Sequence, residues 1–199
     1  RDSASSEVQV SVVIPCRNEA GYIRQFVSSL ENQQLGGGLR WEVLIADGQS
    51  DDGTREILDE LSLCHPWLRV IDNPGKVASS GLNAAIAAAA GAVIVRMDVH
   101  TEYAPDYVRR CLETLDRTGA DNVGGPWQAK GVNYTGKAIA AVFNSPFAAG
   151  GALSHRRDYE GPVDTVYLGC WRRELLRGVG GFDPQLVRNQ DDELNFRII

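Results

Sequence analysis

The sequence predicts an α/β fold in which a mostly parallel, doubly wound sheet is flanked by helices. Short segments rich in β-branched residues alternate four times along the chain with segments whose apolar residues recur at the period of a helix. Turns that contain glycine, proline or several polar residues separate them. Alternation of this kind favours parallel strands joined by right-handed crossovers. The 199 residues, 43% of them hydrophobic and 23% charged, suit one globular domain with a buried core.

The first strand and helix have clear patterns. Val8–Ile14 is expected to be a buried strand, because valine and isoleucine dominate it and Pro15 ends it. Residues 19–33 are expected to form an amphipathic helix, since their apolar side chains follow one another at three- and four-residue spacings.

The second unit follows the flexible glycines 36–38. Trp41–Ala46 is expected to be a strand, and residues 47–53 a polar loop. Asp52 can cap the helix that follows, which is expected to run to about Leu63.

The third and fourth units are shorter. Leu68–Ile71 and Ala92–Met97 are expected to be strands, and Val77–Ala90 an alanine-rich helix that ends at Gly91 as a C′ glycine. Asp106–Thr118 is expected to be the fourth helix.

Beyond residue 118 the periodicity weakens. Residues 122–124 and 165–168 are candidate strands, and residues 171–178 a candidate short helix. Residues 125–161 are rich in small side chains without a clear period, which is expected of a loop region that faces a substrate.

Composition excludes several classes of function. The net charge of -6 and the absence of a dense Lys/Arg block argue against binding to nucleic acid. The four cysteines form no CxxC pair or zinc pattern and are expected to be reduced thiols. The longest apolar run, residues 84–95, is too short for the roughly 20 residues that span a bilayer. The chain has no initial Met and no signal segment and ends in an apolar stretch, so we expect the native protein to continue.

Polar residues follow three of the four predicted strands. In open parallel sheets, ligands bind beyond the carboxyl ends of the strands. Residues 15–19 follow the first strand, residues 47–52 the second and residues 98–100 the fourth, and each of these segments contains acids. Their common position at one sheet edge predicts a ligand site there.

Asp98 and His100 are candidate metal ligands. Side chains two residues apart in an extended segment point the same way, so a carboxylate and an imidazole could face one ion. Such a pair suits Mn²⁺, or Mg²⁺ less well, and a metal there would neutralise a diphosphate leaving group. The alternative is that Asp98 caps a turn and His100 is an ordinary surface histidine.

Two further groups of acids are candidates for binding and catalysis. Asp47 directly follows an apolar strand and could accept hydrogen bonds from a base or a ribose, whereas Asp51 and Asp52 are more typical of a turn and a helix cap. The acids at 191–193 could supply a general base or could merely favour a helix N-terminus.

Several catalytic motifs are missing. The chain has no G-x-G-x-x-G fingerprint, no Walker A loop and no G-x-S-x-G elbow. A dinucleotide-dependent oxidoreductase is therefore disfavoured, although its sheet would be similar. A nucleotidyltransferase remains an alternative, but it would need a glycine-rich, basic triphosphate loop that Arg17 alone does not supply.

An ordered set of motifs resembles the inverting glycosyltransferases of family 2. VVIPCRNE at 12–19 resembles their opening strand and P-x-x-N-E, and DGQSDDGT at 47–54 resembles D-G-S-S-D-x-T. GLNAA at 81–85 resembles A-x-N-x-G, and RMDVH at 96–100 resembles the strand that ends in D-x-D. GGFD at 180–183 and QDDEL at 190–194, with Arg197, resemble G-G-F-D and E-D-x-x-L-x-x-R. The resemblance runs from Val8 to Arg197.

The resemblance implies a GT-A fold, with a Rossmann-like nucleotide-sugar half at 8–105 and an acceptor and catalytic-base half at 106–199 within one domain. It implies inverting, metal-assisted transfer from a nucleotide diphosphate sugar, with a UDP-sugar such as UDP-glucose as the leading donor and Mn²⁺ or Mg²⁺ as cofactor. Asp191 would be the general base and Asp192 its substitute. The metal would lie at Asp98 and His100. The nucleotide would contact Pro15, Arg17, Glu19, Asp47, Lys76 and Asp98.

Two positions depart from the family pattern. His100 replaces the second Asp of D-x-D, which bears on the identity of the metal, and Gln190 replaces the Glu of E-D. A nucleotide-sugar-binding domain without turnover is therefore the alternative function. The D-x-H variant and the QDDEL string at 190–194 resemble the bacterial exopolysaccharide subgroup, including succinoglycan-type glucosyltransferases. That subgroup implies a glycan or lipid-linked acceptor, and a cytoplasmic location at the inner face of the membrane through segments absent from this chain.

Overall fold

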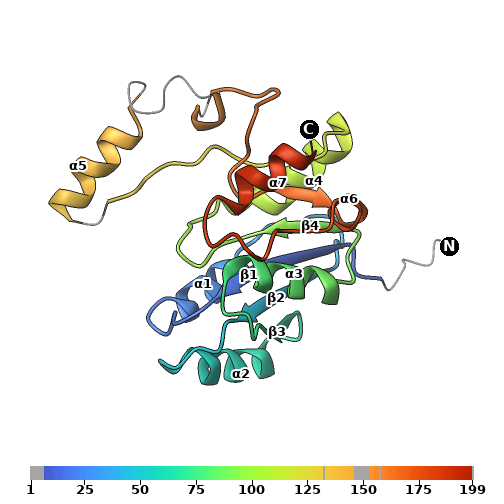
Figure 1. Ribbon diagram of the computed structural model, residues 1–199, viewed down its shortest axis with the longest axis vertical. Helices are drawn as coiled ribbons and strands as arrows, with labels where there is room; N and C mark the ends of the chain where they lie inside the picture. Colours follow the sequence, from blue (N-terminus) through green and yellow to red (C-terminus); the bar gives the residue numbers. More distant parts are fainter. Residues whose placement is uncertain (1–6, 132, 146–152, 157, 199) are drawn as a thin grey trace.

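The computed structural model describes residues 7–131, 133–145, 153–156 and 158–198. Its centre is a five-stranded sheet in the order β3-β2-β1-β4-β5 (Figure 1). β1, β2, β3 and β4 are parallel, and β5 pairs with β4 in the antiparallel direction, so the predicted mostly parallel sheet is confirmed. The strands are β1 Val10–Cys16, β2 Trp41–Asp47, β3 Leu68–Asp72, β4 Val93–Arg96 and β5 Cys170–Arg172.

Helices follow the strands largely as the periodicity predicts, but α1 begins four residues later than expected because residues 20–22 form a turn. The helices are α1 Ile23–Glu31, α2 Thr54–Cys64, α3 Ala78–Ala88, α4 Tyr107–Thr118, α5 Tyr134–Phe143, α6 Arg173–Gly178 and α7 Gln190–Ile198, with a 3₁₀ turn at Leu153–His155. No helix among the described residues is long and apolar enough to cross a membrane.

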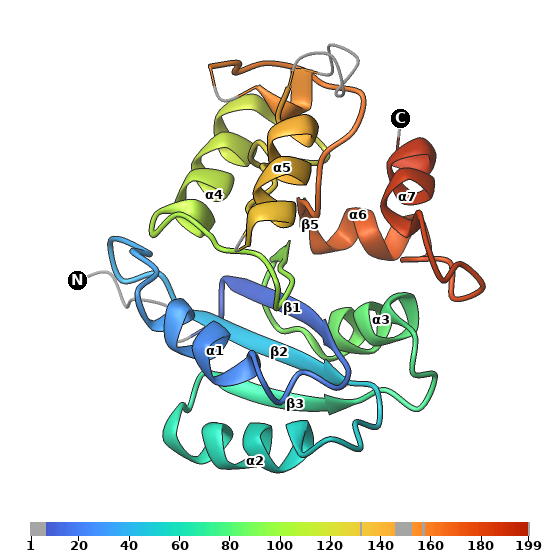
Figure 2. The ribbon, with the colours of Figure 1, turned by 90° about the vertical axis from the view of Figure 1, so that its left-hand side faces the viewer.

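The two faces of the sheet carry separate cores, because successive side chains of a strand point to opposite faces. Val12 and Val43 contact α1, α2 and α4 on one face. Val13 and Leu44 lie on the other face with α3, α6 and α7, where the rings of Trp171 and Phe182 meet edge to face. Figure 2 shows the strands between these two helical layers.

The second half of the chain differs from the prediction in three places. Residues 165–168 are not a strand, and the edge strand lies instead at Cys170–Arg172, where Val123 makes an isolated bridge to Cys170. The short helix therefore begins at Arg173, not at residue 171. Within the predicted loop 125–161, of which residues 132, 146–152 and 157 lie outside the description, residues 134–143 form α5.

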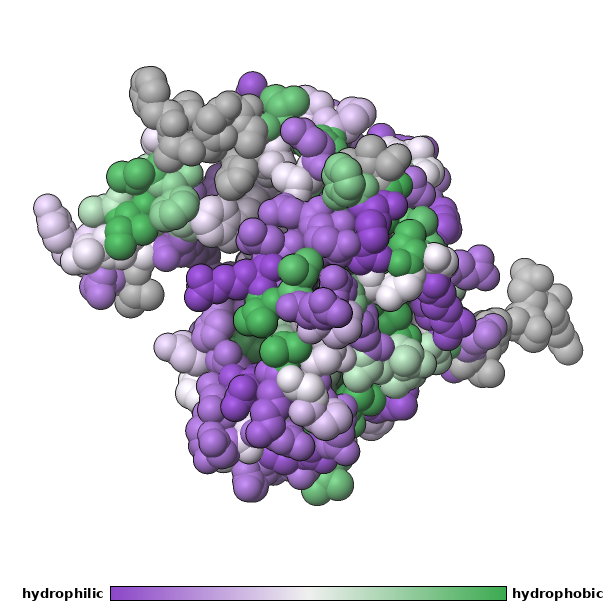
Figure 3. Space-filling model, viewed as in Figure 1, coloured by the Kyte–Doolittle hydropathy of each residue, from purple (hydrophilic) through white to green (hydrophobic). Residues whose placement is uncertain are grey.

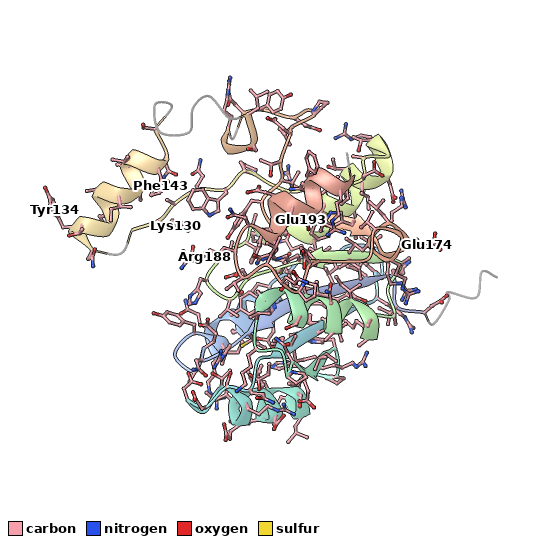
Figure 4. All side chains as sticks on the ribbon, viewed as in Figure 1. Lys130, Tyr134, Phe143, Glu174, Arg188 and Glu193 are labelled. Atoms are coloured by element: carbon pink, nitrogen blue, oxygen red, sulfur yellow. The ribbon has the colours of Figure 1, made fainter. Side chains whose placement is uncertain are left out.

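Helix α5 extends from the body of the protein with most of its apolar side chains in solvent. Tyr134 is 90% exposed and Val142 62% exposed, and Ala140 is the one residue of α5 that is buried. Figure 3 shows the resulting apolar surface at the end of the molecule where α5 lies, and Figure 4 shows Tyr134 and Phe143 on this helix.

Gly91 is not the C′ glycine that the sequence predicts. Helix α3 ends at Ala88, and Ala89 stands at the C-cap in an extended conformation. Gly91 instead lies against β1, where its amide donates a 2.9 Å hydrogen bond to the hydroxyl of Ser11. A Cβ at this position would lie 2.6 Å from the amide nitrogen of Ser11 and from the carbonyl carbon of Val10. Only glycine fits this close approach between backbones.

Gly91→Ala is therefore expected to lower the free energy of unfolding by about 1–3 kcal/mol, since the extra methyl overpacks a rigid backbone contact. Gly178→Ala is the matched control, because a Cβ there has no neighbour within 4 Å, and its expected change is within about 0.5 kcal/mol. Urea denaturation of both variants measures the difference. Equal stabilities would contradict the packing role of Gly91.

Candidate functional site

The loops after β1 and β2 are joined into one surface by hydrogen bonds. The Asn18 side-chain amide donates to Asp51 at 2.9 Å, and the Asp51 backbone amide donates back to the Asn18 side chain at 3.0 Å. Further backbone amides, those of Asn18, Glu19 and Ala20, donate to the side chains of Ser50, Thr54 and Asp52.

Asp51 and Asp52 therefore have the local structural roles that the sequence favours for them. Asp52 accepts a 3.0 Å hydrogen bond from the amide of Thr54, the first residue of α2. The N-cap position itself is held by Gly53, whose φ of 94° lies in the left-handed region. Asp52 thus supports the start of α2 from one residue further back.

Asp47 ends β2 and lies in a cleft of about 510 Å³. Its side chain is nearly inaccessible, and one carboxylate oxygen accepts a 2.6 Å hydrogen bond from the Ser50 hydroxyl. Arg55 lies 3.8 Å from the other oxygen and also donates to Asp72 at 2.6 Å. The cleft is lined by Asp47, Gln49, Ser50, Arg55, Asp72 and Pro74.

Asp72 and Arg55 are members of this cleft that the sequence reasoning missed. Asp72 ends β3 and stands next to Asp47 in the register of the sheet, so it obeys the same strand-end rule as the other acids. That signal was present in the sequence, since Asp72 directly follows the apolar residues of the third strand. The position of Arg55 on α2 carried no comparable signal.

The other predicted nucleotide contacts lie at the same edge of the sheet but outside this cleft. Pro15 is half-buried within β1, opposite Ala46. Arg17 is exposed, and its stem lies so close to Gly48 that a Cβ on that glycine would be 3.2 Å from the Arg17 Cβ. Lys76 is exposed in the turn after β3, with a φ of 61°.

Asp98, His100 and Glu19 form a polar cluster beyond β4. One Asp98 carboxylate oxygen accepts a 2.9 Å hydrogen bond from the backbone amide of His100. The His100 imidazole Nε2 lies 2.9 Å from a carboxylate oxygen of Glu19, which brings the loop after β1 into the same cluster. The Tyr103 hydroxyl accepts a 2.7 Å hydrogen bond from the Asp98 amide, a contact that the sequence did not reveal.

The donor chemistry of Asp98 and His100 can be compared with the needs of a divalent cation. Asp98 and His100 offer the oxygen and nitrogen donors that Mn²⁺ accepts. Among the described residues, no group of three or more His, Cys, Asp or Glu side chains is arranged to hold a metal ion. Oxygens of a bound diphosphate would therefore be needed to complete the coordination of a cation at Asp98 and His100.

Cys16, the last residue of β1, lies under this acidic edge. Burial, and then the negative charges of neighbouring acids such as Glu19 and Asp47, raise the pKa of its thiol to about 12. The thiol is therefore protonated at neutral pH and is a poor nucleophile.

The acids 191–193 all lie in the first turn of α7. Asp191 is half-buried and ion-paired with Arg96, the last residue of β4. Asp192 is exposed and accepts a 3.2 Å hydrogen bond from the Thr165 hydroxyl. Both line a second cleft of about 520 Å³. The cleft is lined by Trp127, Ser154, Thr165, Val166, Tyr167, Val187, Arg188, Asn189, Gln190, Asp191 and Asp192.

Arg96 is a charged residue in an otherwise apolar strand, and the sequence analysis assigned it no role. Its side chain is almost inaccessible, and burial lowers the pKa of its guanidinium. The guanidinium carbon lies 5.5 Å from the centre of the Phe182 ring, a cation–π contact. Because Arg96 precedes Asp98 by two residues, β4 leads directly from the Asp191 ion pair to the Asp98 cluster.

The remaining family-like motifs serve the packing around the site. The Asn83 side chain donates to the carbonyl of Phe182 at 2.7 Å and accepts from its amide at 2.8 Å, which ties α3 to residues 180–183. Arg197 donates to Glu193 and to the carbonyls of Val179 and Gly181. These contacts hold α7 in place over the sheet.

Comparisons with known proteins show the family of the chain. Residues 11–178 match the family model described as glycosyl transferase family 2. The chain is 36% identical over 190 residues to the succinoglycan biosynthesis protein ExoA of Rhizobium meliloti (strain 1021), covering 94% of this chain and 57% of that protein. It is 28% identical over 179 residues to a dolichol-phosphate mannosyltransferase of Pyrococcus furiosus (strain ATCC 43587 / DSM 3638 / JCM 8422 / Vc1), covering 86% and 48%. The chain thus spans about half to three fifths of these relatives.

Solved structures share the fold. The mannosyltransferase PcManGT of Pyrobaculum calidifontis, in complex with GDP-Man and Mn²⁺, aligns with a TM-score of 0.69 at 20% identity, over 98% of this chain and 52% of that one. S. aureus TarS 1-349 in complex with UDP aligns with a TM-score of 0.67 at 17% identity, over 96% and 54%. These likenesses confirm the predicted GT-A fold.

Proposed function

The chain belongs to glycosyl transferase family 2, and on that premise we propose that it transfers a sugar from a UDP-sugar, such as UDP-glucose, to a hydroxyl of a glycan or lipid-linked acceptor, with inversion at the anomeric carbon. One observation carries the proposal. The Asp47 cleft, the Asp98 cluster and Arg96, which is ion-paired with Asp191, all lie at the carboxyl ends of the parallel strands. This common edge supports the proposal that a nucleotide pocket, a diphosphate site and a general base lie next to one another.

In the proposed donor site, the nucleoside enters the cleft at Asp47, whose carboxylate accepts hydrogen bonds from the base or ribose. The diphosphate lies at Asp98, with Pro15, Arg17, Glu19 and Lys76 around the donor. Asp98 and His100 would hold Mn²⁺ or Mg²⁺ together with the diphosphate oxygens. Such an ion would neutralise charge on the departing nucleotide.

In the proposed reaction, Asp191 takes the proton of the acceptor hydroxyl. The acceptor oxygen forms a bond to the anomeric carbon from the face opposite the nucleotide, while the bond from that carbon to the diphosphate oxygen breaks and UDP leaves. No enzyme nucleophile is required in this single displacement, in keeping with the raised pKa of Cys16. Asp192, the next residue in the chain, is the substitute base.

The wider role follows from the relatives. Similarity to a succinoglycan biosynthesis protein and to a dolichol-phosphate mannosyltransferase supports a role in polysaccharide biosynthesis with a glycan or lipid-linked acceptor. We propose residues 8–105 as the donor half and 106–199 as the acceptor and base half. The intact protein would act in the cytoplasm at the inner face of the membrane, with membrane contact through segments outside this chain and no nucleic-acid partner.

A thermal-shift titration followed by a transfer assay tests the proposal on the intact protein. UDP, UDP-glucose, GDP and NADH are each added with and without Mn²⁺. A ligand at about 100 times its Kd stabilises by about 2.7 kcal/mol, a rise in Tm of roughly 5–10 °C for a domain of this size. We expect this rise with UDP and Mn²⁺, and sugar transfer from a UDP-sugar. A rise with NADH alone, or no transfer from any nucleotide sugar, would overturn the proposal.

Binding without turnover is the second candidate, and Gln190 favours it because a neutral amide stands where the family pattern has an acid. The same experiment separates the two functions. A UDP-dependent rise in Tm with no sugar transferred by the intact protein would establish the binding function.

A further inference from the structure

The contact between Arg96 and Asp191 is unusual because the arginine is buried and its hydrogen bonding is incomplete. Arg96 is 4% exposed, and among the described residues its Nε has no hydrogen-bond partner. A buried guanidinium is costly unless it is well paired, so an ion pair of this kind is weak evidence for a stabilising role. The Arg96 side chain nevertheless donates to the carboxylate of Asp191, which lines the cleft of about 520 Å³.

The direction of the Arg96 side chain follows from the pleat of β4. Ile94, two residues earlier, packs on the sheet face that carries α3, α6 and α7, and Arg96 points to the same face. There it contacts the Phe182 ring and the first turn of α7. Asp98 lies two residues further along the same chain segment, so Arg96 links Asp191 to the segment that carries the Asp98 cluster.

Helix α7 has other anchors that do not involve Arg96. Leu194 is fully buried, and Arg197 donates to the carbonyls of Val179 and Gly181. Asn195 accepts a 2.7 Å hydrogen bond from the side chain of Asn122. Because these contacts already hold α7 against the body of the protein, the Arg96 contact is not needed to dock the helix and can act on the Asp191 side chain alone.

We propose that Arg96 is a positioning residue that orients the Asp191 carboxylate and fixes its place relative to the donor held at Asp98. The inference rests on the proposed function and deepens it. A fixed carboxylate matters because a displacement of about 1 Å at a reacting group can cost about a hundredfold in rate. Arg96 would act on the rate of transfer and leave the nucleotide pocket unchanged.

The test compares Arg96→Met, Arg96→Lys and the matched control Arg173→Met in the intact protein. Among the described residues, Arg173 also has a buried Nε without a hydrogen-bond partner, but its guanidinium donates to the carbonyl of Ala89 at the C-cap of α3. For Arg96→Met we expect kcat to fall about 10–100-fold. The Kd for UDP should stay within about twofold of the value for the unsubstituted protein, and the Tm within about 3 °C. Arg96→Lys keeps the charge and is expected to recover part of kcat, and Arg173→Met to leave kcat unchanged.

A double-mutant cycle gives the decisive readout. If Arg96 acts through Asp191, adding Arg96→Met to Asp191→Asn should lower kcat no further, because residues that act as a unit are not additive. An unchanged kcat in Arg96→Met, a parallel loss of UDP affinity, or full additivity with Asp191→Asn would each overturn the inference. Absence of transfer by the unsubstituted protein would instead overturn the proposed function.

Discussion

Asp191→Asn is expected to lower kcat by about 10²–10⁴-fold while the Kd for UDP stays within about threefold. General base catalysis contributes a rate factor of that size, and asparagine keeps the shape of the side chain but cannot take the acceptor proton. Asp191 is half-buried beside Arg96, whereas the cleft at Asp47, the proposed nucleotide site, shares no lining residue with the cleft at Asp191. Initial rates of sugar transfer at saturating donor, with UDP affinity by calorimetry, measure the two effects separately.

Asp192→Asn is the matched control for this variant. Asp192 occupies the same turn of α7 and carries the same charge, but it is exposed and accepts its hydrogen bond from Thr165. We expect its kcat to change by less than about tenfold, because Asp192 is exposed and does not accept the proton in the proposed reaction. A reversed result, with Asp192→Asn the more damaging change, would move the base to Asp192 and contradict the assignment of Asp191.

Asp98→Asn is expected to abolish the stabilisation by UDP with Mn²⁺ and to lower kcat/KM by about 10²–10³-fold. Asparagine can still accept the hydrogen bond from the His100 amide, so the turn beyond β4 is kept and only the negative charge is lost. Charge stabilisation at a leaving group is worth several kcal/mol, which corresponds to a loss of this size. The rise of roughly 5–10 °C in Tm expected for the unsubstituted protein provides the reference.

The control for Asp98→Asn is Asp51→Asn, which removes an acid of the neighbouring loop that bonds to Asn18. This control should retain the rise in Tm, because asparagine can still accept the hydrogen bond from Asn18. A full UDP-dependent rise in Asp98→Asn would show that the diphosphate does not depend on this carboxylate. The site would then have to be sought at Arg17 and Lys76.

Much of the fold was predictable because its signals are local. The parallel strands are mostly apolar segments of four to seven residues with turns at their ends, and such segments specify strands without reference to distant residues. β5 has only three residues, too few for a period to be recognised, and its pairing with β4 joins distant segments. Gly91 was misread because its role is a close approach to β1, which no local pattern reports.

In the candidate site, too, residues with a local signal could be predicted and contacts between distant residues could not. Asp47 and Asp98 could be named from the sequence because each ends a strand, and their positions at one sheet edge follow from parallel pairing. The contact between Arg96 and Asp191 could not be predicted from the sequence, since the two residues are 95 positions apart. The pairing of His100 with Glu19, 81 positions apart, was out of reach for the same reason.

The hydrogen bonds between the loops after β1 and β2 also have a thermodynamic consequence. Ordering a flexible loop around a ligand costs conformational entropy, and that cost is subtracted from the binding free energy. Here Asn18 and Asp51 exchange two hydrogen bonds, and the amides of Glu19 and Ala20 are already satisfied by side chains of the opposite loop. The ordering entropy of this edge is therefore lost when the protein folds, and a ligand that binds here would meet loops that are already in place.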